Sequence, residues 1–184
     1  TREAALAGLP SAMRAQLAVL AAMRDALPGA RIVGDSTQPV YAGNLAHDHG
    51  LPGGWTNAAT GYGALGYAIP AAIGAALADP ETPVICLAGD GGAQFTLPEL
   101  MTAREAELPI RVVVWNNRGY REIADWMEAA GLPPIGCAPA PPDFADIARA
   151  CEMPHGKTGP DPARIAAALA NAPADRPSIL EITV

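Results

Sequence analysis

Two short apolar runs constrain the fold of this chain more than any other feature of its sequence. Residues 83–88 and 110–115 are rich in Val and Ile and lack the regular alternation of polar and apolar side chains that a half-buried strand would show. Such runs are typical of parallel strands that are covered on both faces. Residues 97–107, which lie between them, carry helix-forming side chains and end before Pro109. This order predicts two central parallel strands joined by a right-handed helical crossover.

The flanking sequence continues the alternation of helices and strands. Further helices are expected at residues 12–27, 62–77, 120–130, 143–150 and 161–170, and further strands at residues 31–34, 153–158 and 178–184. The whole pattern predicts an α/β fold, a three-layer sandwich with a mainly parallel sheet of about five or six strands.

Two segments carry no sustained hydrophobic period. Residues 35–60 are rich in Gly, Pro, Asn and His and are predicted to be mostly loop, and loops of that length usually carry function. Residues 131–142 hold five prolines and are expected to be irregular. We interpret this second segment as a lid or a subunit contact.

Composition excludes several classes of protein. Residues 1–184 are expected to form one domain, which is long enough to bury a core without disulfides or metals. The chain has 12 basic and 19 acidic side chains, a formal charge of −7, and no cluster of Lys and Arg, so nucleic acids and anionic membranes are not expected partners. The longest apolar stretch, residues 65–78, is interrupted by Gly and Pro and is too short to span a bilayer.

The cysteines and histidines form no recognisable disulfide or zinc pattern. Cys86, Cys137 and Cys151 are odd in number and irregular in spacing, which favours a reducing cytoplasm. His47 and His49 have the residue type of a metal pair, but they lie in a glycine-rich segment without a third ligand. We expect these two side chains to be solvated or to face a substrate.

A glycine-rich turn with one acidic residue follows the first buried strand. Gly89, Gly91 and Gly92 surround Asp90, and glycines let the backbone approach a ligand closely and direct free amides at a phosphate. A carboxylate beside a phosphate is repelled unless a divalent cation lies between them, so Asp90 is a candidate Mg²⁺ ligand. Taken alone, the Gly-Asp-Gly tripeptide is more often an ordinary turn.

A second polar turn strengthens the metal interpretation. Asn116 and Asn117 follow the second buried strand, and the 24 residues from Gly92 to Trp115 hold one helix and one strand. Both turns are therefore expected at neighbouring strand ends, on the edge where open parallel sheets bind ligands. Mg²⁺ prefers oxygen ligands in an octahedron. The candidates for its protein ligands are Asp90, Asn117 and the backbone carbonyl of Gly119.

This arrangement resembles the thiamine-diphosphate-binding motif, in which Gly-Asp-Gly is followed at this spacing by Asn-Asn. Residues 61–74, GYGALGYAIPAAIG, are similar to the segment that precedes the motif in acetolactate synthases and benzoylformate-type decarboxylases. The resemblance covers nearly the whole chain, from about residue 32 to residue 184. It implies the thiamine-diphosphate-binding fold, the cofactors thiamine diphosphate and Mg²⁺, and a C-terminal diphosphate-binding domain of that superfamily.

The same resemblance implies roles for particular residues. It makes Leu65 the bulky side chain that forces the cofactor into a V shape, and the carbonyl of Gly63 the acceptor for the aminopyrimidine nitrogen. Thr37 and Gln38 fall where the family contacts the diphosphate. The remaining cofactor-binding residues are Gly89, Gly91 and Gly92. Without the motif, Leu65 would be interpreted as an ordinary core leucine.

The resemblance also implies that part of the enzyme lies outside this chain. In this superfamily a glutamate from a separate pyrimidine-binding domain, usually of a partner subunit, activates the cofactor, so we expect no catalytic residue here. The chain begins at Thr1 rather than Met, and we expect a C-terminal fragment of a three-domain enzyme or a natural half of a two-chain enzyme. The full-length enzyme is expected to be a dimer or tetramer, and the isolated chain to be inactive.

Substrate choice is expected in the helix after the second turn. The resemblance places Glu122, Ile123 and Trp126 against the substrate pocket of an enzyme that decarboxylates a 2-oxo acid. Acetolactate synthases and benzoylformate decarboxylases have apolar residues at the position of Glu122, and a carboxylate that faces a substrate is costly unless it meets a cation. A guanidino 2-oxo acid, such as 5-guanidino-2-oxopentanoate, meets this requirement.

Other interpretations stay open. Glu122 is also typical of the solvent-facing side of a helix, paired with Arg118 or Arg121. The main alternative function is an acetolactate synthase large subunit that condenses 2-oxo acids, because Trp126 lies at the same distance from Asn-Asn as the pocket tryptophan of that family. A non-catalytic nucleotide-binding module is less favoured, since neither G-x-G-x-x-G nor a Walker lysine follows a strand.

Overall fold

Six parallel strands lie at the centre of the structure. The computed structural model describes residues 2–184, and its strands follow the order β2-β1-β3-β4-β6-β5 in one sheet. Their bounds are Arg31–Gly34 for β1, Trp55–Asn57 for β2, Val84–Gly89 for β3, Ile110–Asn116 for β4, His155–Thr158 for β5 and Ser178–Thr183 for β6. Every neighbouring pair is parallel, which confirms the predicted sheet of five or six strands.

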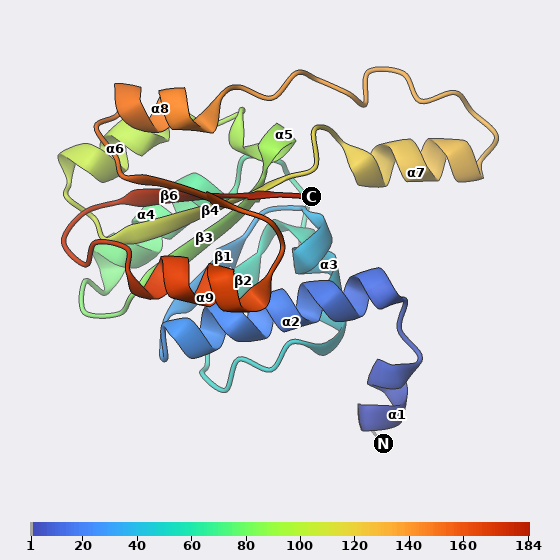
Figure 1. Cartoon of the computed structure of the whole chain (residues 1–184), viewed down its shortest axis with the longest axis horizontal. Coiled ribbons are helices and arrows are strands. Elements are labelled where there is room, and N and C mark those ends of the chain that lie inside the picture. Colours follow the sequence, from blue (N-terminus) through green and yellow to red (C-terminus); the bar gives the residue numbers. More distant parts are fainter. Residues whose placement is uncertain (1) are drawn as a thin grey trace.

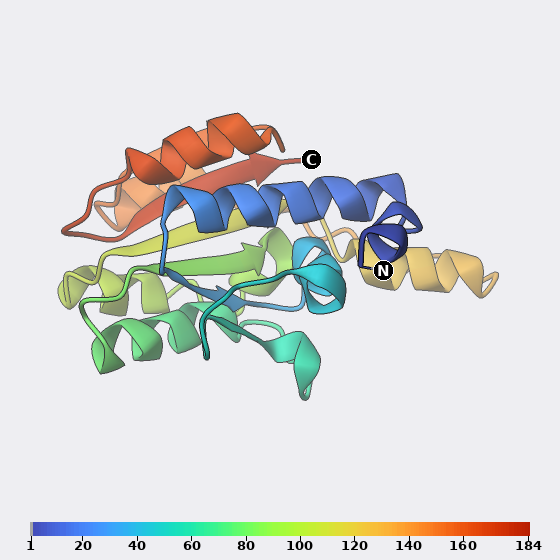
Figure 2. The same ribbon diagram turned by 90° about the horizontal axis from the view of Figure 1, so that it is seen from below.

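Helices cover both faces of the sheet and complete the three predicted layers. Figure 1 shows α6 and α8 above the sheet and α2 and α9 below it, and Figure 2 shows α2 and α9 side by side. The helices are α1 (Arg2–Ala7), α2 (Ser11–Ala26), α3 (Gln38–Ala46), α4 (Ala68–Ala78), α5 (Asp90–Ala93), α6 (Glu99–Glu105), α7 (Arg121–Ala129), α8 (Phe144–Ala150) and α9 (Pro162–Ala170). Among residues 2–184, no helix has the length and apolar character needed to cross a membrane.

The hydrophobic core lies on both sides of the sheet because side chains alternate along each strand. In β4, Val112 and Val114 point to the layer of α4, α6 and α8, whereas Val113 and Trp115 point to the layer of α2, α3 and α9. All four side chains are buried, as expected for a strand that is covered on both faces. The polar residues that follow the strand are therefore left at the edge of the sheet.

The prediction of mostly loop for residues 35–60 is wrong. This segment contains α3, β2 and a short 3₁₀ helix at Ala58–Thr60. α3 packs closely on the sheet edge through Gly43, where an added Cβ would lie 2.5 Å from the ring of Trp55. A helix of nine residues that contains Gly and Pro, followed by a strand of three, gives no sustained hydrophobic pattern.

Two further boundaries differ from the prediction. α4 begins at Ala68 rather than near residue 62, because the preceding chain turns at Gly63 and Gly66, whose φ angles are 76° and 84°. The helical turn α5, which lies between β3 and the predicted helix at α6, was not predicted. The other expected helices and strands are observed within a few residues of their predicted bounds.

α7 and the chain after it stand away from the three layers (Figure 1). No residue of α7 is buried, and residues 131–142 form no helix or strand, as their prolines predict. Large apolar side chains are exposed here, namely Ile123, Trp126, Leu132 and Ile135. The role of lid or subunit contact stays a prediction.

Replacing Phe144 by Ala tests the core beneath α8. Phe144 is 1 % exposed, so its removal should lower the free energy of unfolding by about 3–5 kcal/mol through lost apolar burial and the cavity left behind. Ile135→Ala, at a side chain that is 77 % exposed, is the control and should change the free energy of unfolding by less than about 0.5 kcal/mol. Urea unfolding measures both variants, and equal small losses would contradict the packing of α8 on the sheet.

Candidate functional site

A cavity of 310 Å³ opens at the edge of the sheet where the strands end. Its walls come from the chain after β1, β3 and β4, from the turn before α4, and from the start of α7. It is lined by all the residues predicted to bind the cofactor: Thr37, Gln38, Gly63, Leu65, Gly89, Gly91 and Gly92. Asn117, Gly119, Glu122 and Ile123 line it as well.

Glycines bring the backbone after β3 to the surface of this cavity. A Cβ at Gly91 would lie 2.4 Å from the ring of Tyr120, and one at Gly92 would lie 3.0 Å from Asp35 Oδ2. At Gly89 it would lie 3.1 Å from the hydroxyl oxygen of Thr37. A side chain at Gly91 would force the ring of Tyr120 to move, and one at Gly89 or Gly92 would need its neighbour to give by a few tenths of an ångström, so glycine favours the close packing here.

Asp90 lies beneath this turn with 0 % of its surface exposed. Its Oδ1 accepts a hydrogen bond from the backbone N–H of Asn117 at 3.2 Å, but within the described chain its buried Oδ2 has no partner. Burial raises the pKa of the Asp90 carboxyl group, and hydrogen bonds from the backbone oppose that shift. A buried carboxylate oxygen without a partner is costly, and a bound cation would remove the cost.

The side chain of Asn117 and the carbonyl of Gly119 lie beside Asp90. The side-chain oxygen of Asn117 lies 2.8 Å from the carbonyl oxygen of Gly119 and 3.2 Å from Asp90 Oδ1, and exchanging the amide oxygen and nitrogen would let Asn117 donate to both. Mg²⁺ with octahedral ligands at 2.0–2.1 Å places adjacent oxygens about 2.9 Å apart. The oxygens therefore fit part of a magnesium shell, and rotation of the amide would satisfy them without an ion.

The turn after β4 has an unusual backbone. Arg118 has a positive φ of 60°, and Gly119 has a φ of 151°. A Cβ at Gly119 would lie 2.5 Å from the carbonyl oxygen of Cys137. The turn therefore requires glycine where it presents its carbonyl to the site.

Asp35 fixes the turn that carries Gly63 and Leu65. Its Oδ2 accepts from the backbone N–H of Gly66 and its Oδ1 from that of Ser36, both at 2.8 Å. Burial raises the pKa of the Asp35 carboxyl group, and these backbone hydrogen bonds oppose the shift. Ser36 Oγ donates to the carbonyl of Gly63 at 3.2 Å, beside the half-buried Leu65.

A second cavity, of 530 Å³, shares Tyr41, Glu122 and Ile123 with the first. Its other walls are apolar and come from α7 and the residues that follow it. Trp126, which was predicted to face the substrate pocket, lines this second cavity and is 74 % exposed.

Glu122 places a negative charge on the wall between the two cavities. No basic side chain that the structure describes forms an ion pair with it, so the alternative pairing with Arg118 or Arg121 is not observed. Burial raises the pKa of the Tyr41 hydroxyl, a hydrogen bond with the side chain of Ser36 lowers it, and the charge of Glu122 raises it further. Tyr41 therefore keeps its proton and presents a hydroxyl group at this wall.

Sequence reasoning missed three residues that line the first cavity: Tyr41, Tyr120 and Arg121. Tyr41 lies three residues after Gln38 in α3, so recognition of that helix would have placed both on one face. Residues 116–119, which carry the predicted Mg²⁺ ligands Asn117 and Gly119, are called the metal turn below. Tyr120 follows this turn directly, and the absence of a side chain at Gly91 makes room for its ring.

His47 and His49 do not line either cavity. The Nε2 of His47 lies 3.4 Å from Nδ1 of His49, and the ring of His47 packs on Trp55 with centroids 4.9 Å apart. In the part of the chain that the structure describes, no three His, Cys, Asp or Glu side chains are grouped to hold a metal ion. These histidines therefore do not face the candidate site.

Comparisons with known proteins agree with this geometry. Residues 33–182 match the model of the family "Thiamine pyrophosphate enzyme, C-terminal TPP binding domain". The chain is 43 % identical over 135 residues to the probable 2-ketoarginine decarboxylase AruI of Pseudomonas aeruginosa, covering 72 % of this chain and 24 % of that protein. It is 34 % identical over 123 residues to the acetolactate synthase isozyme 3 large subunit of Escherichia coli, covering 66 % of this chain and 21 % of that protein.

Solved structures show the same fold. The thiamine diphosphate-dependent 4-hydroxybenzoylformate decarboxylase of Rhodococcus jostii superposes with a TM-score of 0.81 at 26 % identity, over 92 % of this chain and 32 % of that one. The benzoylformate decarboxylase of Polynucleobacter necessarius superposes with a TM-score of 0.79 at 22 % identity, over 91 % of this chain and 32 % of that one. By its sequence, its fold and the residues around its cavity, this chain belongs to the family of C-terminal TPP-binding domains of thiamine pyrophosphate enzymes.

Proposed function

We propose that this chain is the thiamine-diphosphate and Mg²⁺ binding domain of a longer enzyme that decarboxylates a 2-oxo acid with a cationic tail. The observation that carries the proposal is the buried Asp90 carboxylate, whose Oδ2 has no partner in the described chain and which lies close to the Asn117 amide and the Gly119 carbonyl beside a glycine-lined cavity. The chain spans about a quarter of the length of the Pseudomonas aeruginosa relative. The activity of the whole protein is therefore inferred from this site and from the relatives together.

The metal turn and the glycine turn, residues 89–92 at the end of β3, fit the diphosphate end of the cofactor. Asp90, Asn117 and the carbonyl of Gly119 would hold Mg²⁺, which would neutralise the buried Asp90 carboxylate. Thr37 and Gln38, together with the glycine turn after β3, would bind the diphosphate. Thiamine diphosphate, when bound, supplies the electron sink for loss of CO₂ from a 2-oxo acid.

The turn before α4 fits the other end of the cofactor. The carbonyl of Gly63 would accept a hydrogen bond from the aminopyrimidine while it also accepts from Ser36, because a carbonyl oxygen has two lone pairs. The side chain of Leu65 would press against the cofactor and set its bend. Asp35 would keep both residues in place through its bond to Gly66.

Further parts of the enzyme are proposed to complete the site. The activating glutamate is assigned to a pyrimidine-binding domain, in this enzyme or in a partner subunit of a dimer or tetramer. The exposed apolar residues of α7 and the following chain support a covering partner, since Trp126 is 74 % and Ile135 is 77 % exposed. The three free, buried cysteines fit a reducing compartment such as the cytoplasm.

Glu122 supports the choice of substrate class. It lies on the wall of a mostly apolar cavity beside the cofactor site and forms no ion pair with any described basic side chain. The Pseudomonas aeruginosa relative is named for 2-ketoarginine, which is 5-guanidino-2-oxopentanoate. We propose that the aliphatic part of such a substrate lies along Ile123 and that its guanidinium group pairs with Glu122.

Asp90→Asn tests the metal site in the full-length enzyme. The variant removes one anionic ligand without changing the shape of the side chain, so Mn²⁺ affinity should fall roughly 100-fold when measured by electron paramagnetic resonance. The unliganded variant should unfold at a temperature no lower than the parent, because a buried unpaired carboxylate is lost. Asp175→Asn, at an exposed carboxylate, is the control. Wild-type Mn²⁺ affinity in Asp90→Asn would contradict the assignment.

Glu122→Gln tests the substrate. In the full-length enzyme the variant should lower kcat/KM for 5-guanidino-2-oxopentanoate roughly 10- to 100-fold, the loss expected of a charge-assisted hydrogen bond worth about 1.5–3 kcal/mol. The kcat/KM for pyruvate, which does not reach this carboxylate, should fall only slightly. Glu128→Gln, at an exposed position of the same helix, is the matched control. Equal small effects on both substrates, or a parent enzyme that prefers pyruvate, would favour acetolactate synthase instead.

A further inference from the structure

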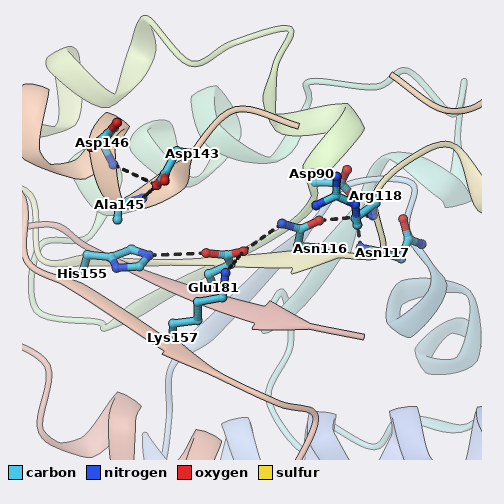
Figure 3. A network of polar contacts seen from close by, with 10 residues as sticks. All are labelled: Asp90, Asn116, Asn117, Arg118, Asp143, Ala145, Asp146, His155, Lys157 and Glu181. Atoms are coloured by element: carbon cyan, nitrogen blue, oxygen red, sulfur yellow. Dashed lines mark hydrogen bonds and ion pairs between the residues drawn. The ribbon is translucent and has the colours of Figure 1, made fainter. Parts of the chain in front are cut away.

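A buried carboxylate behind the metal turn has no part in the proposed function. Glu181 in β6 is 4 % exposed and does not line the cofactor cavity. Its Oε1 accepts from Asn116 Nδ2 at 2.8 Å and from Lys157 Nζ at 3.0 Å, and His155 Nε2 lies 3.7 Å from its Oε2 (Figure 3). Glu181, in β6, therefore links Asn116 at the end of β4 with Lys157 in β5, close to the edge of the sheet that carries the site.

Asn116 is held in one orientation by two hydrogen bonds. Its Nδ2 donates to Glu181, and its Oδ1 accepts from the backbone N–H of Arg118 at 3.1 Å. An ionised carboxylate only accepts and an N–H only donates, so rotating the amide by half a turn would break both bonds. Glu181 and the Arg118 N–H thus together fix which way the amide of Asn116 points.

The bond to Arg118 closes the turn that carries two of the proposed metal ligands. It spans Asn117 and leads into Gly119, and it holds Arg118 at its positive φ of 60°. The backbone N–H of Asn117 meets Asp90 Oδ1 across the same turn (Figure 3). Without the Asn116 bond, the strained Arg118 backbone would have one contact fewer to keep it in this conformation.

We propose that Glu181 is a positioning residue for the metal turn. By fixing the amide of Asn116, it holds the backbone in the conformation that directs the oxygens of Asn117 and Gly119 at Asp90. Lys157 balances the buried charge of Glu181 without touching the turn. The inference rests on the metal site of the proposed function. It adds a residue that supports the metal ligands indirectly, through Asn116 and the backbone of the metal turn.

Mn²⁺ binding to the full-length enzyme, measured by electron paramagnetic resonance, tests this role apart from catalysis. Asn116→Ala and Glu181→Ala should each weaken Mn²⁺ binding about 10-fold, as loss of a support behind metal ligands does. Glu181→Gln should stay within about 3-fold of the parent, because its amide oxygen can still accept from Asn116. The double variant Asn116→Ala/Glu181→Ala should bind no more weakly than Asn116→Ala, since both act through one contact.

Leu169→Ala is the matched control for loss of stability. This side chain is 1 % exposed in the core on the opposite face of the sheet, so the variant should lower the unfolding temperature and leave Mn²⁺ affinity unchanged. The proposal is overturned if Leu169→Ala weakens Mn²⁺ binding as much as Glu181→Ala does. Asn116→Ala, which leaves Glu181 its partner Lys157, carries the test if Glu181→Ala does not fold.

Asp90→Asn separates failure of this inference from failure of the proposed function. If Asp90→Asn loses Mn²⁺ while Asn116→Ala and Glu181→Ala bind it as the parent does, Glu181 has a purely structural role and the metal site stands. If Asp90→Asn binds Mn²⁺ normally, the metal site is wrong and the positioning role falls with it.

Discussion

The parallel pairing of β3 with β4 determines where the chemistry of this chain can lie. The register matches Gly89 with Trp115, so the two strands end at the same level and their polar turns begin side by side. Asp90 and Asn117 are 27 positions apart in the sequence, yet they are hydrogen-bonded across this edge. The same pairing sets which side chains of β4 face each core layer. A register shift of one residue would therefore disrupt the core and the site together.

Three buried carboxylates around this edge differ in the hydrogen-bond and ion-pair partners that satisfy them. Asp35 is satisfied by backbone N–H groups of Ser36 and Gly66, and Glu181 by Asn116 and Lys157. Asp90 alone among the three keeps a buried oxygen without a partner in the described chain. The fold therefore contains the means to satisfy buried carboxylates, and the one that it leaves unsatisfied lies where a cation is proposed to bind.

Local pattern was enough to predict most of the fold and the residues that the structure brings together at the proposed metal site. β3 and β4 are recognisable because strands covered on both faces carry long apolar runs, and Asp90 and Asn117 follow those runs directly. Tyr41 was missed because α3 is short and gives no period. Glu181 gave no signal, since its role depends on the order in which β4, β6 and β5 pair, and that order is set by contacts between distant residues. Trp126 was assigned to the substrate pocket from the resemblance; it lines the second cavity together with Glu122, and its role there stays a proposal.

α7 and the first part of the proline-rich chain, up to Cys137, form an excursion that begins and ends at one hydrogen bond, from the backbone N–H of Tyr120 to the carbonyl of Cys137 at 2.8 Å. Because the entropy of closing a loop grows only slowly with its length, residues can be inserted or deleted inside this excursion at little cost to the rest of the fold. The wall that carries Glu122 can therefore diverge during evolution while the neighbouring turn of Asn117 and Gly119 stays constant. On the proposed function, new substrate ranges would become accessible by changing this one excursion, without rebuilding the part of the molecule that is proposed to hold the ion.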